Sequence, residues 1–324
     1  MSDFYGYYAT RRPAVEDAYN GTLSRLLAGI PAADTAALMQ SLQGGKKIRG
    51  CLACLVCEGL GGLLEQAMPR AVAVEMIQAA TLLHDDVVDQ DAVRGGRPAV
   101  WTVEGARRTV LIGDVIFAAA IKMMAELSAG DGRAAAGAIA LVSRGALEEP
   151  LDAPALAEKM ASERAAGTLY DEIVRLKTGV LFGAACTLGA IAAGRDGPVA
   201  ETCRRYGLSV GEAYQIADDL KEVRCCLSVR LIDAARMMAV APALLRFAPE
   251  ARPFVLDVLQ GGRQDLDRRR RKLLMEAVRL MEEAIERRAQ DATDAIEGSF
   301  ARNGYREIAR KAPAEIVAIF NQSP

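Results

Sequence analysis

Four aspartates gather at the end of an apolar stretch, in ATLLHDDVVDQD over residues 80–91. On a helix, Asp85 and Asp89 lie one turn apart on the same face, and Asp86 lies about 100° around the axis. Two carboxylates about 5 Å apart repel each other by roughly 3 kcal/mol at an effective dielectric near 20. The helix before them is apolar nearly all round, which is typical of a buried helix. This combination indicates that cations neutralise the cluster.

A second acidic group occurs much later, in GEAYQIADDLKEV over residues 211–223. Asp218 and Glu222 repeat the four-residue spacing of the first group, with Asp219 beside them. Hard divalent cations prefer carboxylate oxygens, and magnesium often bridges a few carboxylates to substrate phosphates. One such group alone is equally well explained as a solvated helix end, but two on apolar helices favour a metal site. The predicted magnesium ligands are Asp85, Asp86, Asp89, Asp218, Asp219 and Glu222.

Basic side chains that suit a diphosphate stand in two other stretches. In LQGGKKIRG, Lys46, Lys47 and Arg49 begin a helix, where free N–H groups also favour anions. The guanidinium of an arginine matches phosphate oxygens with a fork of donors. In RLKTGVLF, Lys177 stands among apolar neighbours. A solvated turn is the alternative for Lys46 and Lys47, whereas Lys177 fits that alternative poorly.

Two other patterns carry weaker chemical signals. His84 is the only histidine, and beside hard oxygen ligands a hydrogen-bonding or packing role is favoured over catalysis. Cys51, Cys54 and Cys57 resemble part of an iron–sulfur spacing, but a fourth cysteine in register is missing. Leucines, a valine and an alanine fill the gaps, so we interpret the three thiols as core residues of an apolar helix.

The elements that position these residues are predicted to be helices almost throughout. Helical periodicity dominates, no convincing strand alternation is found, and breaks fall at glycine pairs and prolines. We therefore expect one all-α domain over residues 1–324. The expected helices cover residues 13–29, 33–43, 47–60, 65–91, 99–127, 133–147, 155–193 with a kink near Gly179, 198–223, 229–247, 250–260 and 265–297, with short pieces to the end.

Composition narrows the class of protein. The 324 residues are 51% hydrophobic and 25% charged, with a formal net charge of -2, as in globular proteins with a large core. A near-neutral charge argues against a nucleic-acid binder. The first residues lack the apolar core of a secretion signal, and charge, glycine or proline interrupts every apolar run before transmembrane length. We therefore expect a cytoplasmic protein whose seven cysteines are reduced.

Four segments of the chain together resemble a known family. GGKKIRG, LLHDDVVDQDAVRGGRP, LKTG and YQIADDLKE occur in the order, and at about the separations, found in the trans-isoprenyl diphosphate synthases, or polyprenyl synthetases. The resemblance extends from about Gly44 to Pro242. It implies an isoprenoid synthase-type helical bundle around a central cavity, usually a homodimer. It also implies a magnesium-dependent transferase of isoprenoid biosynthesis, a prenyltransferase that joins isopentenyl diphosphate to an allylic diphosphate.

The resemblance also implies roles for single residues. Residues that resemble the catalytic positions, including the two aspartate motifs, are Asp85, Asp86, Asp89, Lys177 and Asp218. Residues that resemble contacts of the allylic diphosphate are Arg94, Lys177, Thr178 and Gln215. Residues that resemble the isopentenyl diphosphate site are Lys46, Arg49 and Gln78.

Product length in this family depends on residues just before the first aspartate motif. Ala80 and Thr81 stand five and four residues before Asp85, where a bulky aromatic side chain tends to stop chain growth early. Neither residue is bulky, so we expect products of about C20 or longer. Phe117, or Met123 and Met124, from a neighbouring helix are candidates to close the tunnel lower down.

Three departures from the family pattern keep two other functions open. Gly95 stands where the family has a second arginine that contacts isopentenyl diphosphate, Glu222 replaces an aspartate, and the following segment is short and lacks a Gly-Lys element. A lyase resembling terpene synthases would ionise an allylic diphosphate without condensing it. A non-catalytic subunit would complete a heteromeric prenyltransferase. The intact first motif and the retained Lys46 and Arg49 favour condensation over both.

Overall fold

The computed structural model describes residues 3–30, 35–161, 163–300 and 303–321, and helices make up most of them. The helices are α1 (Phe4–Leu27), α2 (Thr35–Leu42), α3 (Ile48–Gly59), α4 (Leu64–Val88), α5 (Val100–Glu104), α6 (Ala106–Leu127), α7 (Ala129–Glu148), α8 (Ala153–Ala161), α9 (Glu163–Ile173), α10 (Val180–Ala192), α11 (Gly197–Leu227), α12 (Ala234–Phe247), α13 (Arg252–Leu259), α14 (Arg268–Ile296) and α15 (Gly304–Asn321). A π-helical turn, η1 (Val174–Gly179), joins α9 to α10, and a 3-10 turn, η2 (Pro249–Ala251), leads into α13. Two short antiparallel hairpins pair β1 (Val93–Arg94) with β2 (Arg97–Pro98), and β3 (Leu231–Ile232) with β4 (Gln264–Asp265).

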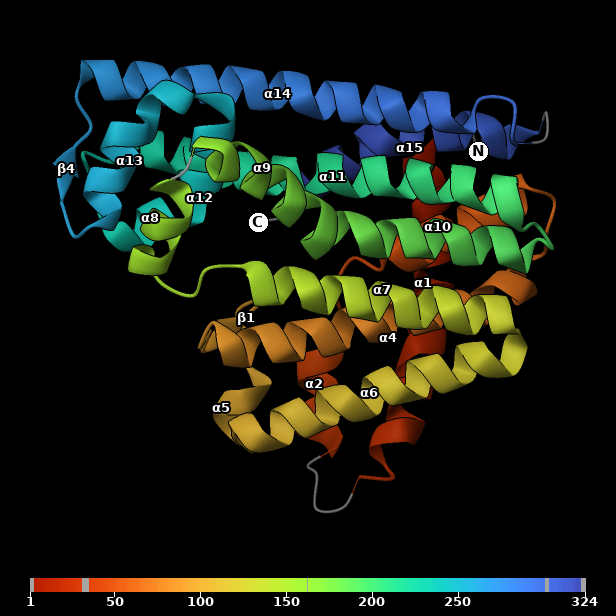
Figure 1. The fold of residues 1–324 in the computed structure, drawn as a ribbon. Helices are drawn as coiled ribbons and strands as arrows, with labels where there is room; N and C mark the ends of the chain where they lie inside the picture. Colours follow the sequence, from red (N-terminus) through yellow and green to blue (C-terminus); the bar gives the residue numbers. More distant parts are fainter. Residues whose placement is uncertain (1–2, 31–34, 162, 301–302, 322–324) are drawn as a thin grey trace.

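The long helices lie side by side (Figure 1). From the top of the view downwards, α14, α11, α10, α7, α4 and α6 follow one another, and each packs against the next. Helix α3 packs against both α4 and α10, and α15 contacts α11 and α14. The two acidic segments, at the end of α4 and within α11, therefore belong to one bundle although they are far apart in the sequence.

Glycines let α10 approach its neighbours closely. A Cβ on Gly189 would lie 2.4 Å from the carbonyl oxygen of Ala53 in α3. A Cβ on Gly207 in α11 would lie 2.3 Å from the carbonyl oxygen of Phe182 in α10. A side chain at either position would push the helices apart, because protein interiors are already close-packed. This close packing holds α11 against α10 and against η1, which carries Lys177.

The all-α prediction is confirmed, and two expected helices are divided for local reasons. The helix expected over 99–127 breaks at Gly105, whose φ of 80° lies in the left-handed region and ends α5. The helix expected over 155–193 is interrupted by the π-helical turn η1 at the expected kink near Gly179, and residue 162 within it lies outside the described residues. The expectation of one domain over residues 1–324 stays a prediction.

Two further elements differ from the expected pattern. Helix α1 begins at Phe4 rather than at residue 13, because the Asp3 side chain caps it by accepting a hydrogen bond from the Gly6 N–H at 2.8 Å. The two hairpins have only two residues in each strand, which is too short to produce an alternating pattern in the sequence.

One stretch, Gly167–Ala192, is long and apolar enough to cross a membrane. It belongs to the interior of the bundle, since 78% of its most apolar 18-residue window is buried within the protein. Within the described part of the chain, this stretch therefore packs as a core helix of the bundle.

The cysteines of α3 are core residues, as interpreted from the sequence. Cys51, Cys54 and Cys57 are buried and free. Burial raises the pKa of the Cys54 thiol to about 12. A protonated, buried thiol packs as a small apolar side chain and is a poor metal ligand.

Candidate active site

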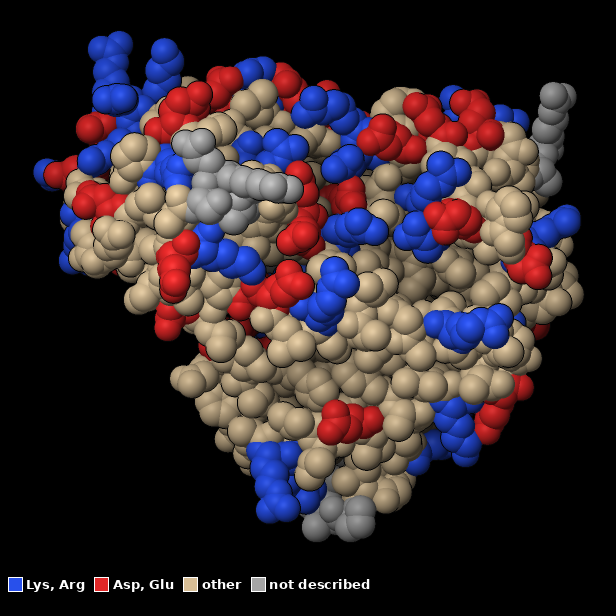
Figure 2. All heavy atoms as spheres, in the orientation of Figure 1, with Lys and Arg blue, Asp and Glu red and all other residues tan. Residues whose placement is uncertain are grey.

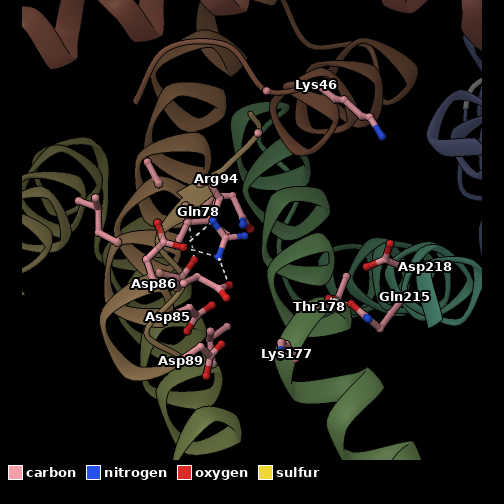
Figure 3. Close-up of a pocket in the computed structure, with 18 of the residues that line it drawn as sticks. Lys46, Gln78, Asp85, Asp86, Asp89, Arg94, Lys177, Thr178, Gln215 and Asp218 are labelled. Atoms are coloured by element: carbon pink, nitrogen blue, oxygen red, sulfur yellow. Dashed lines mark hydrogen bonds and ion pairs between the residues drawn. The ribbon is translucent and has the colours of Figure 1, made fainter. Parts of the chain in front are cut away.

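A cavity of about 1180 Å³ is lined by α4, η1 and α11, together with the α2–α3 loop and the β1–β2 hairpin. Figure 3 shows the aspartates of α4 on one side of it, and Gln215 and Asp218 of α11 on the other. The predicted site residues that line it are Lys46, Arg49, Gln78, Thr81, Asp85, Asp86, Asp89, Arg94, Lys177, Thr178, Gln215, Asp218, Asp219 and Glu222. The structure therefore gathers both acidic groups and the basic residues around one space.

The three aspartates on the α4 side of the cavity differ in their burial and in their partners. Asp86 is buried, and it accepts a hydrogen bond from Arg94 Nε at 2.5 Å. Arg94 also forms an ion pair with Asp91 at 3.4 Å. Burial raises the pKa of Asp85 to about 6, and the neighbouring Asp89 carboxylate raises it further while Lys177 opposes the shift. Burial also raises the pKa of Asp89.

The β1–β2 hairpin positions Arg94 against α4. Its two-residue turn, Gly95–Gly96, has φ values of 57° and 75°, a backbone that glycine adopts without strain. The turn places Arg94 and Arg97 directly opposite each other on the two strands. Arg94 therefore extends to the aspartates from outside the helix that carries them.

The wall formed by α11 holds Asp219 in a chain of neutral hydrogen bonds. Tyr170 Oη donates to Asp219 at 2.8 Å, and Gln215 Nε2 donates to it at 2.9 Å. Thr178 Oγ1 in turn donates to Gln215 Oε1 at 2.5 Å. Burial raises the pKa of Asp219 to about 6, although these hydrogen bonds oppose the shift. Burial also raises the pKa of Asp218, against the opposing charge of Lys221.

Lys177 projects from η1 toward the aspartates of α4 (Figure 3). Its Nζ donates to both carboxylate oxygens of Glu149 at 3.0 Å. Burial alone would lower the pKa of Lys177, but the carboxylates of Glu149, Asp85 and Asp89 raise it overall. The lysine is therefore charged where it lines the cavity. A π-helical turn carries an extra residue, and such turns are frequent at functional sites.

The start of α3 forms a basic end of the cavity. Burial lowers the pKa of Lys46, with the nearby charge of Lys221 adding to the effect. The Arg49 guanidinium lies 4.5 Å from the ring centroid of Phe182, and its buried Nε has no hydrogen-bond partner among the described residues. Buried nitrogens of this kind are costly unless an anion or water satisfies them. This end therefore suits an anionic ligand.

The solvated-turn alternative is wrong for Lys47. Its side chain is buried, with Nζ 3.7 Å from the ring centroid of Tyr19. Its φ of 51° is left-handed, which starts α3 abruptly after the glycine pair. Lys47 lines the cavity beside Lys46, so it contributes positive charge to the same end.

His84 has the packing and hydrogen-bonding surroundings expected for it. Its Nε2 lies 3.0 Å from the carbonyl oxygen of Val110 and 3.6 Å from Asp114 Oδ1. Its ring meets Phe117 edge-on at 5.4 Å. These partners all belong to α6, so the ring turns away from the aspartates that follow it.

The residues predicted to set product length lie at different depths. Thr81 lines the cavity. Ala80 is fully buried in the core between α4 and its neighbours, and Phe117 packs against the same cluster. Their influence on chain length stays a prediction.

The acidic residues supply the right ligand chemistry for magnesium. The six predicted ligands offer carboxylate oxygens, which hard cations prefer. Among the residues that the structure describes, no three acidic, cysteine or histidine side chains converge closely enough to form a complete metal site. Magnesium keeps several waters and shares substrate phosphates, so widely spaced carboxylates remain compatible with it. The roles assigned to individual residues stay predictions.

Among the cavity residues that interact with the predicted site, Glu149 and Tyr170 were not singled out from the sequence, and Arg97 was noted only as a nearby charge that offsets the aspartates. Tyr170 stands two helical turns before Lys177, and this spacing is a signal that sequence alone contains. Glu149 lies just beyond the end of α7 and meets Lys177 only through the fold. Arg97 becomes part of the cavity because the Gly95–Gly96 turn folds it back beside Arg94.

Known proteins resemble this chain in sequence and in fold. A family model described as polyprenyl synthetase matches residues 33–225. The chain is 32% identical over 184 residues to a geranylgeranyl diphosphate synthase of Methanosarcina mazei, covering 56% of this chain and 55% of that protein. It is 36% identical over 188 residues to a heptaprenyl diphosphate synthase component 2 of Geobacillus stearothermophilus, covering 57% of this chain and 56% of that protein. It thus spans about half the length of these curated relatives.

A solved structure extends the likeness along the chain. The crystal structure of a polyprenyl synthase from Caulobacter crescentus, complexed with calcium and isoprenyl diphosphate, superposes with a TM-score of 0.77. The two sequences are 26% identical, and the match covers 98% of both chains. The family model alone spans more than half of the 324 residues. The chain belongs to the polyprenyl synthetase family.

Proposed function

We propose that this protein is a magnesium-dependent prenyltransferase that condenses isopentenyl diphosphate with an allylic diphosphate. The observation that carries the proposal is one cavity with two acidic walls and a separate basic end. Condensation requires two diphosphates in one space, and the acidic and basic regions offer different sites for them. Membership of the polyprenyl synthetase family supports the same reaction.

The allylic diphosphate would lie between α4 and α11. Magnesium held by Asp85, Asp89 and Asp218 would stabilise the negative charge that builds on the departing diphosphate. Lys177 is charged and stands beside this position, so it would donate to the phosphate oxygens. The hydrogen-bonded chain from Thr178 through Gln215 would keep the α11 wall in place.

Isopentenyl diphosphate would lie at the basic end, against Lys46, Arg49 and Gln78. An anion bound at this end would satisfy the buried Nε of Arg49, which has no hydrogen-bond partner in the described part of the chain. The apolar residues of the wall exclude water, which would otherwise capture the allylic cation. The two substrates would then meet with the double bond facing the cation.

The basic end also weighs against a lyase that uses the allylic diphosphate alone. Such an enzyme needs one diphosphate site, whereas Lys46, Lys47 and Arg49 add a basic group from the start of α3 to a cavity that Lys177 and Arg94 also line. A heteromeric assembly is the second candidate, because one relative is named as component 2 of a heptaprenyl diphosphate synthase. That candidate is compatible with a catalytic role for this chain.

We also propose that the chain forms a homodimer through the outer face of α6 and α7. Figure 2 shows few charged side chains over this lower part of the view. Its large apolar residues, each at least 37% exposed, are Val110, Leu111, Val115, Leu127, Leu141 and Leu147. An exposed apolar patch of this kind marks a contact surface. Sedimentation should show a dimer that Leu111→Asp converts to monomer; a wild-type monomer would contradict the proposal.

The deciding assay supplies magnesium and one allylic diphosphate, either dimethylallyl, geranyl or farnesyl, with and without isopentenyl diphosphate. Elongated products, identified by mass, are expected only when both substrates are present, with chains of about C20 or longer. Hydrocarbon or alcohol formed from the allylic substrate alone would favour the lyase. No product in any mixture would favour a subunit that needs a partner. The cytoplasmic location stays a prediction.

A further inference from the structure

Positive charges on the cavity wall differ in how the protein neutralises them. Arg94 is paired with the carboxylates of Asp86 and Asp91. Lys177 is paired with the carboxylate of Glu149. Arg97 Nη1 donates a hydrogen bond to the backbone carbonyl oxygen of Gln40, which is its hydrogen-bond partner among the described residues. A carbonyl orients a guanidinium but leaves its full charge available to an anion.

The two arginines of the hairpin interact with different elements of the fold. Arg94 and Arg97 are cross-strand partners in the β1–β2 pair. Arg94 turns to the aspartates of α4, whereas Arg97 reaches the last turn of α2. The chain runs from that turn directly into the Gly44–Gly45 loop and Lys46. Arg97 is therefore fixed to the helix that leads into the basic end, and it lines the same cavity as Lys46 and Arg49.

The geometry of Arg97 suits a phosphate group. A guanidinium has five N–H donors in a fixed fork, and the described bond to Gln40 uses one of them. That bond anchors the long side chain, so less conformational entropy is lost when the other donors bind phosphate oxygens. The side chain is exposed at the cavity wall, where a ligand would reach it.

Space near the turn is open for such a ligand. A Cβ built on Gly95 or on Gly96 would meet no atom within 4 Å. Gly95 itself lines the cavity and contributes no charge. Arg97, two residues further along the chain, brings a positive charge to this hairpin and lines the cavity.

We propose that Arg97 is a specificity-determining residue that binds the diphosphate of isopentenyl diphosphate together with Lys46 and Arg49. This inference rests on the proposed condensation and names a residue of its second diphosphate site. In this proposal the allylic diphosphate is bound by Lys177 and the acidic walls, without Arg97. Loss of the Arg97 guanidinium should therefore weaken the binding of isopentenyl diphosphate and leave the binding of the allylic diphosphate unchanged.

The test compares Arg97→Gln with wild type in steady-state kinetics, varying each substrate separately. We expect KM for isopentenyl diphosphate to rise about ten- to a hundredfold, since a charge-assisted hydrogen bond is lost. KM for the allylic diphosphate should stay within about twofold. Arg97→Lys keeps the positive charge but loses the forked donors of the guanidinium, so its KM for isopentenyl diphosphate should lie between those of wild type and Arg97→Gln. Arg195→Gln, at an exposed loop position away from the cavity, is the matched control and should behave as wild type.

Binding without turnover separates this inference from the proposed function. Calorimetry with isopentenyl diphosphate alone should show the same loss of affinity in Arg97→Gln, with an unchanged melting temperature. If wild type fails to elongate, the proposed function is wrong, and this titration still decides the role of Arg97. Equal affinity of wild type and Arg97→Gln, or an equal rise in both KM values, would overturn the inference.

Discussion

The two acidic walls of the cavity are held by different kinds of partner. On α4, Arg94 donates to Asp86 and cancels its charge. On α11, Tyr170 and Gln215 donate to Asp219 and are both neutral. Neutral donors orient a carboxylate but leave its negative charge in place. Asp86 on the α4 wall is therefore neutralised by an arginine, whereas the donors to Asp219 on the α11 wall bring no positive charge.

The two walls therefore differ in what holds them in place. The α4 wall can keep its shape before any ligand binds, because Arg94 ties the hairpin to Asp86. The α11 wall is oriented by hydrogen bonds from η1 and α9, so its geometry depends on how these two elements pack against α11. Breaking one wall at a time tests the contribution of each.

The largest effect is expected from removing a predicted metal ligand on either wall. Asp85→Asn and Asp218→Asn should each lower kcat about a thousandfold, because each removes charge that would hold magnesium beside the leaving diphosphate. Steady-state elongation at saturating magnesium measures this effect. Asp17→Asn, at an exposed position of α1, is the control and should keep full activity. A large loss in Asp85→Asn but none in Asp218→Asn would show that the α11 wall takes no part in catalysis.

A smaller effect is expected when the α11 wall keeps its charge and loses its orientation. Tyr170→Phe removes the hydroxyl that donates to Asp219 at 2.8 Å. Activity should fall about tenfold, the worth of one hydrogen bond to a charged group. Tyr305→Phe removes a hydroxyl that donates to Glu58 at 3.1 Å, far from the cavity, and should leave kcat unchanged. Equal kinetics of the two variants would mean that the neutral hydrogen bonds on this wall have no role in turnover.

The smallest expected effect is a pH dependence of stability that both walls share. The pKa values of Asp85 and Asp219 are about 6 in the folded protein, above the ordinary value of 3.8. A carboxyl group with a raised folded pKa binds protons more tightly when folded, so its contribution to stability is lost as pH rises through about 6. Without magnesium, the melting temperature should be higher at pH 5.5 than at pH 7.5, by about 2 °C or more.

Asparagine variants isolate the two carboxyl groups in that measurement. Asp219→Asn cannot titrate, so its gain in melting temperature on acidification should be smaller than that of wild type. Asp85→Asn should show the same reduction, because burial is the main cause of the raised pKa on both walls. An undiminished gain in both variants would contradict these pKa assignments.

Periodicity and local spacing were sufficient to predict most of this arrangement. The four-residue spacing of Asp85 and Asp89 places both on one helix face, and the structure puts both on the cavity wall. The kink near Gly179 is present as η1. Such features depend on neighbours within one or two turns, so the sequence contains the information needed to infer them.

The partners of the charged groups could not be predicted in the same way. Glu149 reaches Lys177 across 28 positions of sequence, and Tyr170 reaches Asp219 across 49. Which side chains meet at such separations is decided by how α7, η1 and α11 pack. The burial of Lys47 against Tyr19 is another case, since a lysine after two glycines is more typical of a solvated turn.

The π-helical turn η1 contains one residue more than an α-helix would need over the same length. Taking one residue out of Val174–Gly179 would let the backbone continue as an ordinary α-helix, at little cost in hydrogen bonds. Because a π-turn accommodates one extra residue, the same deletion would leave α9 and α10 in nearly the same relative orientation. Tyr170 would then stay beside Asp219, and Thr178 beside Gln215. A deletion variant that folds well and keeps both contacts would therefore isolate what the widened backbone itself contributes to the position of Lys177.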